Sequence, residues 1–345
     1  MGKLKISDLE GPFVIADIGS NWKTSNDQSD NLIMAKRHIH DAAEAGVSAV
    51  KFQLFTDREL YGMDGPNQWS LPREWLPELA SYAAQHSLEF MCSAFSKEGY
   101  REVDQFVNLH KVASAEMKAF PLYDWLDKPV LISTGGAHAS EVAALADLLA
   151  GDQILPGKEP GIDFAFLECV ASYPAEPKDY NLRVIEDPAG WMYCGVSDHT
   201  KNDVVALTAV GLGARVFEKH FSTFDRAFGD FPSTPDYPVS IGPVAMAEYV
   251  SKLKQAFAAL GDGRKMARPS ELSMTMRWRR RLKVTEPVKK GDGLFYGKNF
   301  GIFRSIKEDP AAFGPESFRM FDNGTAKCDL APGDPVWHET VEPGK

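Results

Sequence analysis

Short apolar runs alternate with longer amphipathic stretches from residue 13 to about residue 260. The runs lack a strict alternation of apolar and polar residues, which is typical of strands buried on both faces of a parallel sheet. They predict eight strands, at 13–17, 47–53, 88–93, 110–114, 129–134, 164–170, 192–197 and 215–221. The helical period is clearest in the intervening stretches 30–45, 140–149, 204–212 and 239–260.

This alternation of strands and helices predicts an α/β fold. Eight strand–helix units in roughly 250 residues match the size of a (β/α)8 TIM barrel. A doubly wound open sheet is the main alternative, but no GxGxxG segment follows the first strand to suggest a dinucleotide site. We therefore expect a TIM-barrel catalytic domain over residues 1–260.

The pattern changes after residue 260. Residues 261–277 are polar and predict a linker. From 278 to 345, short β-rich segments are separated by turns rich in Gly, Pro and Asp, and no long amphipathic helix accompanies them. The sequence predicts a small, mostly β domain here, and its size is near the lower limit for a unit that folds alone. We therefore expect this domain to pack on a barrel.

Composition excludes several classes of function. A formal net charge of −10 argues against nucleic-acid binding, which needs a basic surface. No apolar stretch approaches the ~20 residues that span a bilayer, and the N-terminus lacks the apolar core of a signal peptide, so we expect a cytoplasmic protein with no membrane contact. The four cysteines are widely spaced without a CxxC, and Cys92, Cys169 and Cys194 predict buried free thiols rather than disulfides or a zinc site.

Polar residues collect where the predicted strands end, the face at which barrel enzymes carry their functional groups. Lys51 and Lys111 stand out because they lie within otherwise apolar strands, where a lysine is seldom buried without a partner. They predict a cationic pocket for phosphate or carboxylate. A Schiff-base lysine, as in an aldolase, and an edge-strand lysine that reaches solvent remain open as alternatives.

His199 and His220 end the last two predicted strands. Side chains at neighbouring strand ends can converge on one divalent cation, for which imidazole is a suitable ligand. Two histidines at this spacing are no metal motif in themselves, so two unrelated strand-end histidines remain the alternative.

Taken together, several segments resemble the N-acetylneuraminate (sialic acid) synthase family. They run in order along most of the chain: IADIGSNW, AAEAGVSAVKFQ, SAFS, KVASAE, KPVLISTGG, ECVASYP, GVSDHT and EKHF. The combination of SDHT with a following EKHF is the most specific of these. The C-terminal RRRLKVTEPVKKGD and NFGIFRS resemble the SAF (antifreeze-like) domain that ends these enzymes.

The resemblance implies a metal-dependent transferase that condenses phosphoenolpyruvate (PEP) with an open-chain N-acylated amino sugar, such as N-acetylmannosamine, to give a nine-carbon 2-keto acid and phosphate. It implies a divalent metal, Mn²⁺ or Mg²⁺, on His199 and His220, with Asp17 as a further catalytic residue. It also implies a domain-swapped homodimer in which the SAF domain covers the partner's barrel. Substrate contacts are implied for Lys51, Gln53, Ser93, Lys111, Ser114, Ser197, Asp236 and Arg304, the last in the partner's site.

Four positions depart from the family pattern. Asp17 stands in place of a glutamate, Trp22 in place of a histidine, and Ala171 in place of a polar neighbour of PEP. The loop after the last strand reads GDFPSTPDYP, which leaves Asp236 as the counterpart of the family's aspartate. These changes leave a second hypothesis, a catalytically altered member that binds a sugar or phosphate ligand.

Overall fold

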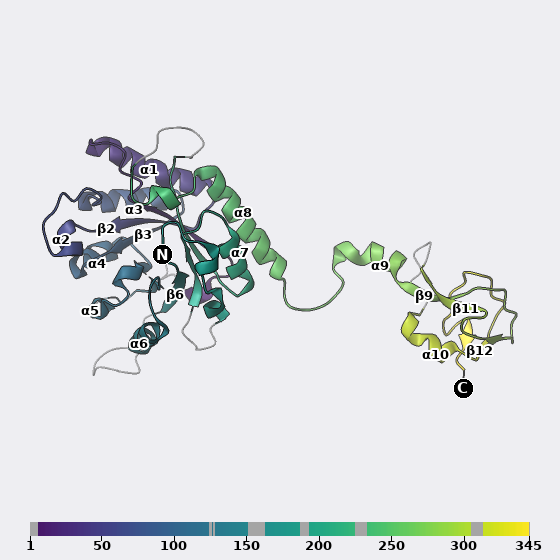
Figure 1. The fold of residues 1–345 in the computed structure, drawn as a ribbon. Helices are drawn as coiled ribbons and strands as arrows, with labels where there is room; N and C mark the ends of the chain where they lie inside the picture. The colour runs from purple at the N-terminus through teal and green to yellow at the C-terminus, as the bar shows by residue number, and fades with distance from the viewer. Residues whose placement is uncertain are drawn as a thin grey trace. The chain divides into compact units, whose positions relative to one another are not determined.

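The chain folds into two compact units, Met1–Gly261 and Asp262–Lys345, which Figure 1 colours from purple to green and from green to yellow. The computed structural model describes residues 6–123, 126, 128–150, 163–186, 193–224, 233–304 and 313–344.

A parallel sheet forms the centre of the first unit. In the described residues its eight strands follow the order β3-β2-β1-β8-β7-β6-β5-β4, and β3 also lies against β4, which closes the sheet into a barrel. The strands are β1 (Phe13–Gly19), β2 (Ala49–Leu54), β3 (Glu89–Ala94), β4 (His110–Val112), β5 (Val130–Ser133), β6 (Phe164–Cys169), β7 (Tyr193–Asp198) and β8 (Val216–His220). The predicted TIM barrel is confirmed, and the open doubly wound sheet is excluded.

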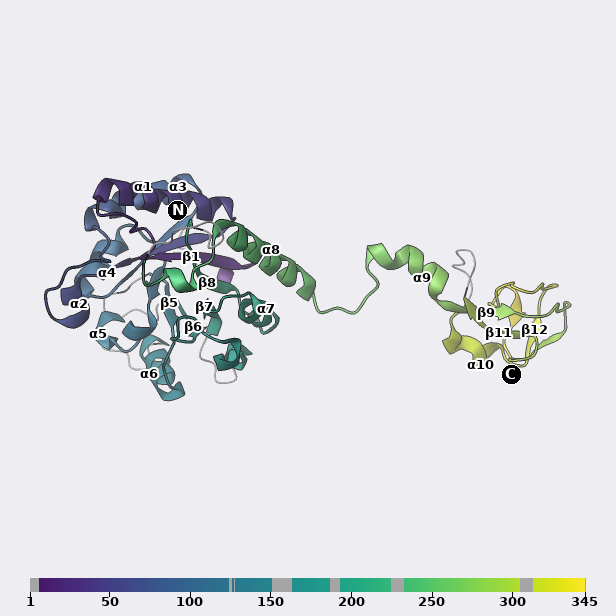
Figure 2. The same cartoon turned by 45° about the horizontal axis from the view of Figure 1, so that its top comes forward.

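Helices surround the strands, as Figures 1 and 2 show from two directions. Asp27 caps the first of them by accepting hydrogen bonds from the backbone N–H groups of Ser29 and Asp30. The helices are α1 (Gln28–Glu44), α2 (Asp57–Tyr61), α3 (Leu76–Gln85), α4 (Lys97–Asp104), α5 (Phe120–Tyr123), α6 (Ala139–Ala150), α7 (Val204–Gly211) and α8 (Pro243–Leu260).

Two expectations about local structure were wrong. Ser114 does not end strand β4, because the chain turns into a 3₁₀ helix over Ser114–Glu116. The regular series of strand–helix units also breaks after β6. Between β6 and β7 the described residues form two 3₁₀ helices, Pro177–Asp179 and Leu182–Glu186, in place of an α-helix. A proline at the first of these positions and the short apolar runs favour tight turns there.

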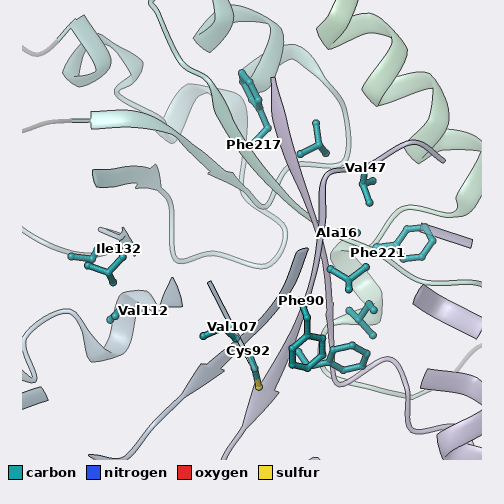
Figure 3. Packing of buried hydrophobic residues seen from close by; sticks show 14 of the residues in the cluster. Ala16, Val47, Phe90, Cys92, Val107, Val112, Ile132, Phe217 and Phe221 are labelled. Carbon is teal, nitrogen blue, oxygen red and sulfur yellow. The ribbon is translucent and has the colours of Figure 1, made fainter. Parts of the chain in front are cut away.

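Buried side chains form two layers in this unit. The larger lies between the sheet and the helices, and Figure 3 shows part of it with Phe90, Cys92 and Phe217 labelled. The smaller fills the barrel interior and consists of Ile6, Phe13, Ile15, Ala49, Met91, Leu109, Leu131, Ala165, Leu167 and Val216.

The second unit has its own small core. In its described part, β9 (Arg280–Val284) pairs with β11 (Phe300–Arg304), and β10 (Gly293–Leu294), β12 (Gly324–Ala326) and β13 (Val341–Glu342) form an antiparallel sheet. Leu282, Phe300 and Phe321 are among the fully buried residues between them. Helix α9 (Leu272–Trp278) occupies the second half of the segment expected to be a linker, and α10 (Phe318–Phe321) is a single turn.

The described helices are each too short or too polar to cross a membrane. The cysteines of the described chain are free thiols. Cys92 and Cys169 are buried as expected, whereas Cys194 is partly exposed and Cys328 fully exposed. Burial raises the pKa of the Cys92 thiol to about 12.

Close approach of β7 and β8 depends on a glycine. A Cβ on Gly195 would lie 1.9 Å from the backbone oxygen of Val216, and no side-chain rotation relieves a contact with backbone. We predict that Gly195→Ala lowers the free energy of unfolding by at least about 3 kcal/mol, at or above the usual range for overpacking. The control is Gly211→Ala, where a Cβ meets no atom within 4 Å. Chemical denaturation that gives both variants the same stability would contradict this account.

Candidate functional site at the barrel mouth

The period of two along each strand places a polar layer directly above the apolar interior. Two residues after Ile15 comes Asp17, two after Ala49 comes Lys51, and two after Val216 comes Glu218. In the same way Lys111 follows Leu109 and Ser133 follows Leu131. The residues of this layer are therefore expected to point towards the barrel axis, at the carboxyl ends of the strands.

Four charged side chains of this layer are in mutual contact within the described structure. Lys51 Nζ lies 2.9 Å from Asp17 Oδ2 and 3.8 Å from Glu218 Oε2. Lys111 Nζ lies 3.5 Å from Glu218 Oε1 and donates a 2.8 Å hydrogen bond to Ser133 Oγ. The four charged side chains are each at most 5% exposed. Glu218 thus bridges two buried ammonium groups.

The surroundings of these groups shift their pKa values. Burial alone would lower the pKa of Lys51, but the carboxylates of Asp17 and Glu218 outweigh it and raise the pKa. Burial opposes ionisation of Glu218, yet Lys111, Lys51 and a hydrogen bond from Ser197 lower its pKa. For Lys111, burial is the largest effect and lowers the pKa, and the positive charge of Lys51 acts in the same direction. Mutual attraction therefore offsets much of the cost of burying these charges.

The two histidines lie beside this layer. The His199 and His220 ring centroids are 5.5 Å apart, and both residues are buried. His199 Nδ1 is 2.8 Å from the backbone oxygen of Val170, so this nitrogen carries a hydrogen and donates it to that oxygen. His220 Nδ1 lies 3.6 Å from Asp17 Oδ2. Tyr173 covers both rings: it stacks on His199 at 4.3 Å and meets His220 edge-on at 5.8 Å between centroids.

Hydroxyl groups complete the mouth of the barrel. Ser197 Oγ donates to Glu218 Oε1 at 2.8 Å. Ser114 Oγ accepts from the backbone N–H of Gly135 at 3.0 Å. Gln53 and Ser93 are paired in the register of β2 and β3, one step above the layer of Lys51.

Asp236 reaches the same mouth from the connection between β8 and α8. Its Oδ2 accepts from Ser20 N at 2.7 Å and from Ser20 Oγ at 2.6 Å. Gly19, with φ +53°, allows the Asp236 carboxylate to approach, because a Cβ on residue 19 would lie 2.4 Å from Asp236 Oδ2. The buried Asn21 holds the same connection through Thr234 Oγ1 at 2.6 Å and Ser240 Oγ at 2.8 Å.

Several buried polar atoms of this mouth lack a hydrogen-bond partner within the described chain. They are Asp17 Oδ1, Ser93 Oγ, Glu218 Oε2 and His220 Nδ1. A buried polar group without a partner is costly, and such groups in a native structure call for an explanation. Their convergence at the carboxyl end of a barrel is the arrangement of a site that binds a polar ligand.

Comparison with known proteins agrees with this location. The model of the NeuB family matches residues 38–265, which is most of the barrel. The chain belongs to the NeuB family. Among curated relatives, it is 29% identical to the spore coat polysaccharide biosynthesis protein SpsE of Bacillus subtilis, over 95% of this chain and 93% of that protein. It is also 29% identical to the N,N'-diacetyllegionaminic acid synthase of Legionella pneumophila, with coverage of 81% and 82%.

Solved structures show the same fold. The putative spore coat polysaccharide biosynthesis protein E of Chromobacterium violaceum superposes with a TM-score of 0.70 at 22% identity. The match covers 96% of this NeuB-family chain and 100% of that chain. At this identity the likeness establishes the architecture of the chain and nothing about its substrate.

The histidine pair of this NeuB-family chain fits part of a metal site. His199 has its Nδ1–H fixed by a backbone carbonyl, which is how metal-ligating histidines are usually oriented. His220 has a buried Nδ1 with no hydrogen-bond partner in the described structure. No three His, Cys, Asp or Glu side chains cluster as a metal site among the described residues. The two histidines by themselves would leave the other positions of a divalent cation to water or substrate.

The structure brings together the predicted site residues that belong to the first unit. The ten predicted residues of the first unit lie at the carboxyl ends of the strands or in the loops that follow them: Asp17, Lys51, Gln53, Ser93, Lys111, Ser114, Ser197, His199, His220 and Asp236. Arg304 belongs to the second unit, where it ends β11 and is exposed. Sequence reasoning assigned no role to Glu218, although it opens the EKHF segment, and it did not single out Tyr173.

Two departures from the family pattern, Trp22 and Ala171, lie in different parts of the first unit. Trp22 is buried in the core between sheet and helices, edge-on to Trp75 at 5.5 Å between centroids. Ala171 does lie at the mouth, since its Cβ is 3.3 Å from the position of a Cβ on Gly135, beside Ser114 Oγ. Trp22 is therefore a change in packing, and Ala171 is a change in the site itself.

The segment after β6 holds His199 from the outer side. The Tyr180 hydroxyl accepts from His199 N at 3.0 Å and donates to the backbone oxygen of Ser197 at 3.2 Å. Next to it, the Asn181 N–H donates to Glu168 Oε1 at 3.3 Å. Burial raises the pKa of Glu168 to about 7.

This shift predicts a pH dependence of stability. Because the folded pKa of Glu168 lies above the unfolded value of about 4.5, the unfolded chain ionises first, and stability falls as pH rises from about 4.5 to above 7. Glu168→Gln should therefore raise the free energy of unfolding by about 1–3 kcal/mol at pH 8 and leave it nearly unchanged at pH 4.5. Denaturant titrations at both pH values measure this. Equal stabilisation at both would exclude ionisation as the cause.

Proposed function

We propose that this NeuB-family protein is a PEP-dependent sugar-acid synthase. It would condense PEP with an open-chain N-acylated amino sugar, such as N-acetylmannosamine, to form a nine-carbon 2-keto acid and inorganic phosphate. The observation that supports this most is the buried layer of Lys51, Lys111, Asp17 and Glu218 beside two histidines at the barrel mouth. The relatives named as sugar-acid synthases point to the same class of reaction.

The lysines would bind the anionic substrate. Asp17 and Glu218 hold the two ammonium groups in place before substrate arrives, so no large rearrangement is needed to present them. Ser93, Ser114, Ser197 and Gln53 would donate hydrogen bonds to phosphate and carboxylate oxygens. Ser93 is the most available of these, because its buried Oγ has no hydrogen-bond partner in the described structure.

Asp17 would handle the proton. One oxygen accepts from Lys51, and the other, Oδ1, is buried without a hydrogen-bond partner in the described chain. That oxygen can accept a proton from the water that is consumed when phosphate leaves, or orient that water. A divalent cation, Mn²⁺ or Mg²⁺, held by His199 and His220 would supply Lewis acidity to polarise the aldehyde of the sugar.

The sugar side would be formed by Asp236 and by Arg304 of a second chain. Asp236 is fixed by two hydrogen bonds from Ser20, so its remaining oxygen can accept from a sugar hydroxyl. Arg304 is exposed at the end of β11 and offers a planar, permanently charged donor group. We accordingly propose a cytoplasmic homodimer in which the small SAF-like domain is swapped and covers the partner's barrel.

A ligand-binding member without catalysis is the second candidate, favoured by Ala171 at the mouth. A phosphate-release assay with PEP, Mn²⁺ and a panel of N-acylated hexosamines separates the two, with mass spectrometry to detect the 2-keto acid. The synthase releases phosphate in proportion to product. A protein that binds PEP and sugar, yet releases no phosphate with any acceptor, would refute the synthase.

Lys51→Met tests how PEP is bound. Because a charge-assisted contact contributes about 1.5–3 kcal/mol, kcat/KM for PEP should fall by about one to two orders of magnitude, with a much smaller change in KM for the sugar. The matched control is Lys118→Met, which removes an exposed lysine paired with Glu141. Equal effects of Lys51→Met on both substrates would count against the assignment.

Mixing two inactive variants tests whether the site is shared. Arg304→Ala lacks the arginine and His199→Ala lacks a histidine, so each homodimer should be inactive. A swapped heterodimer has one barrel with both histidines that receives an intact Arg304, and we expect partial recovery of activity there. If heterodimers form, as measured by differently tagged chains, and no activity returns, the shared site is wrong.

A further inference from the structure

The residues between the site residues of β7 and β8 form a buried ion pair. Ser197 and His199 flank Asp198, and Glu218 and His220 flank Lys219, so alternation turns Asp198 and Lys219 to the outer face of the sheet. The two are register partners in the parallel pairing of β7 and β8. Lys219 Nζ lies 2.9 Å from Asp198 Oδ2, and their side chains are 1% and 0% exposed.

This pair also holds the loop that carries His199. Lys219 Nζ donates to the backbone oxygen of Thr200 and, at 3.1 Å, to that of Asn202. Asp198 Oδ1 accepts from Thr200 N at 2.8 Å and from Thr200 Oγ1 at 2.7 Å. His199 therefore sits between two backbone positions that are tied to the end of β8, the strand that ends in His220.

Packing alone does not account for a charged pair at this place. Two residues earlier on the same faces, the register partners are Val196 and Phe217, both fully buried and apolar. A buried ion pair pays a large desolvation cost, and well-packed apolar residues are often as stable or more so. Along the described β7–β8 pairing, the outer-face partners change from Val196 and Phe217 to the charged Asp198 and Lys219 at the strand ends that lead to His199 and His220. An ion pair with directional hydrogen bonds stands here in place of apolar packing. Such bonds suit a place where the geometry of the two strand ends must be fixed.

We propose that the Asp198–Lys219 pair is a positioning device that sets the ring orientation and separation of His199 and His220. It acts through the ends of β7 and β8, and neither residue touches substrate. The inference that this geometry serves a shared cation rests on the proposed function. The inference that the pair fixes the His199 ring is independent of the proposed function. The ring is oriented by the contact of its Nδ1 with the Val170 backbone oxygen, which exists in the chain without any metal or substrate.

The test uses the full-length chain and two readouts. Without metal, long-range ¹H–¹⁵N NMR of the imidazole rings reports whether His199 keeps its hydrogen on Nδ1, with His199→Ala to assign the signal. With Mn²⁺, titration followed by electron paramagnetic resonance gives the Kd. The variants are Lys219→Met, the neutral double variant Asp198→Asn/Lys219→Met, and Lys219→Arg, which keeps the charge. Lys252→Met is the matched control, because it breaks a nearby but exposed pair with Asp203.

We expect Lys219→Met and the double variant to lose the single Nδ1–H signal of His199 and to bind Mn²⁺ about 10–100-fold more weakly, the usual effect of removing support behind a metal ligand. Lys219→Arg should recover part of both, and Lys252→Met should change neither. The double variant leaves no unpaired buried charge, so it decides the matter if the single variant does not fold. A folded double variant with an unchanged His199 signal and unchanged Mn²⁺ affinity overturns the proposal.

The two proposals fail in different ways. Wild-type chain that binds no Mn²⁺, or that binds it equally well after His199→Ala, refutes the metal site of the proposed function. In that case the NMR signal of the metal-free double variant still decides the positioning role: its loss supports the role, and its persistence refutes it.

Discussion

The barrel mouth depends on the mutual neutralisation of charges that are buried together. Lys51, Lys111, Asp17 and Glu218 are almost completely excluded from solvent, and none of them would be tolerable there alone. Glu218 is central, because it lies between the two lysines and also accepts from Ser197. Loss of any one of the four would leave an uncompensated charge in the interior, so the layer is constrained as a unit.

This constraint links folding to chemistry. The apolar residues below the layer close the barrel to water from one side, and they lower the polarity around the charges above them. Charges in such a place attract an anionic ligand more strongly than they would in water. The polar atoms that remain without partners in the described residues, such as Asp17 Oδ1 and Ser93 Oγ, face the same region. The fold thus leaves its unsatisfied hydrogen-bonding capacity where a substrate can use it.

Much of this could be predicted from the sequence, because the strands are short apolar runs separated by helical patterns. Each of the eight barrel strands begins and ends within two residues of the predicted position, since buried parallel strands are recognisable as apolar runs. The expectation of a cationic pocket at Lys51 and Lys111 followed from their place in such runs, where a lysine is seldom buried without a partner. The contact between Lys111 and Glu218 could not be predicted in this way. It depends on how far β4 and β8 are staggered across the barrel, and no local sequence pattern contains that information. The Asp198–Lys219 pair depends in the same way on the pairing of β7 with β8.

The departures from the family pattern can now be weighed by where they lie. Trp22 packs edge-on against Trp75 in the core between the sheet and the helices, so this departure changes packing. Asp17 keeps the negative charge that Lys51 requires, so the charge balance of the layer survives the shorter side chain. Ala171 stands at the mouth in place of a polar residue, beside Ser114 and Gly135. The charge balance of the layer is kept although Asp17 is changed, and Ala171 lies beside Ser114 at the mouth. The departures therefore argue for altered ligand contacts on an intact charged layer rather than for loss of the chemistry.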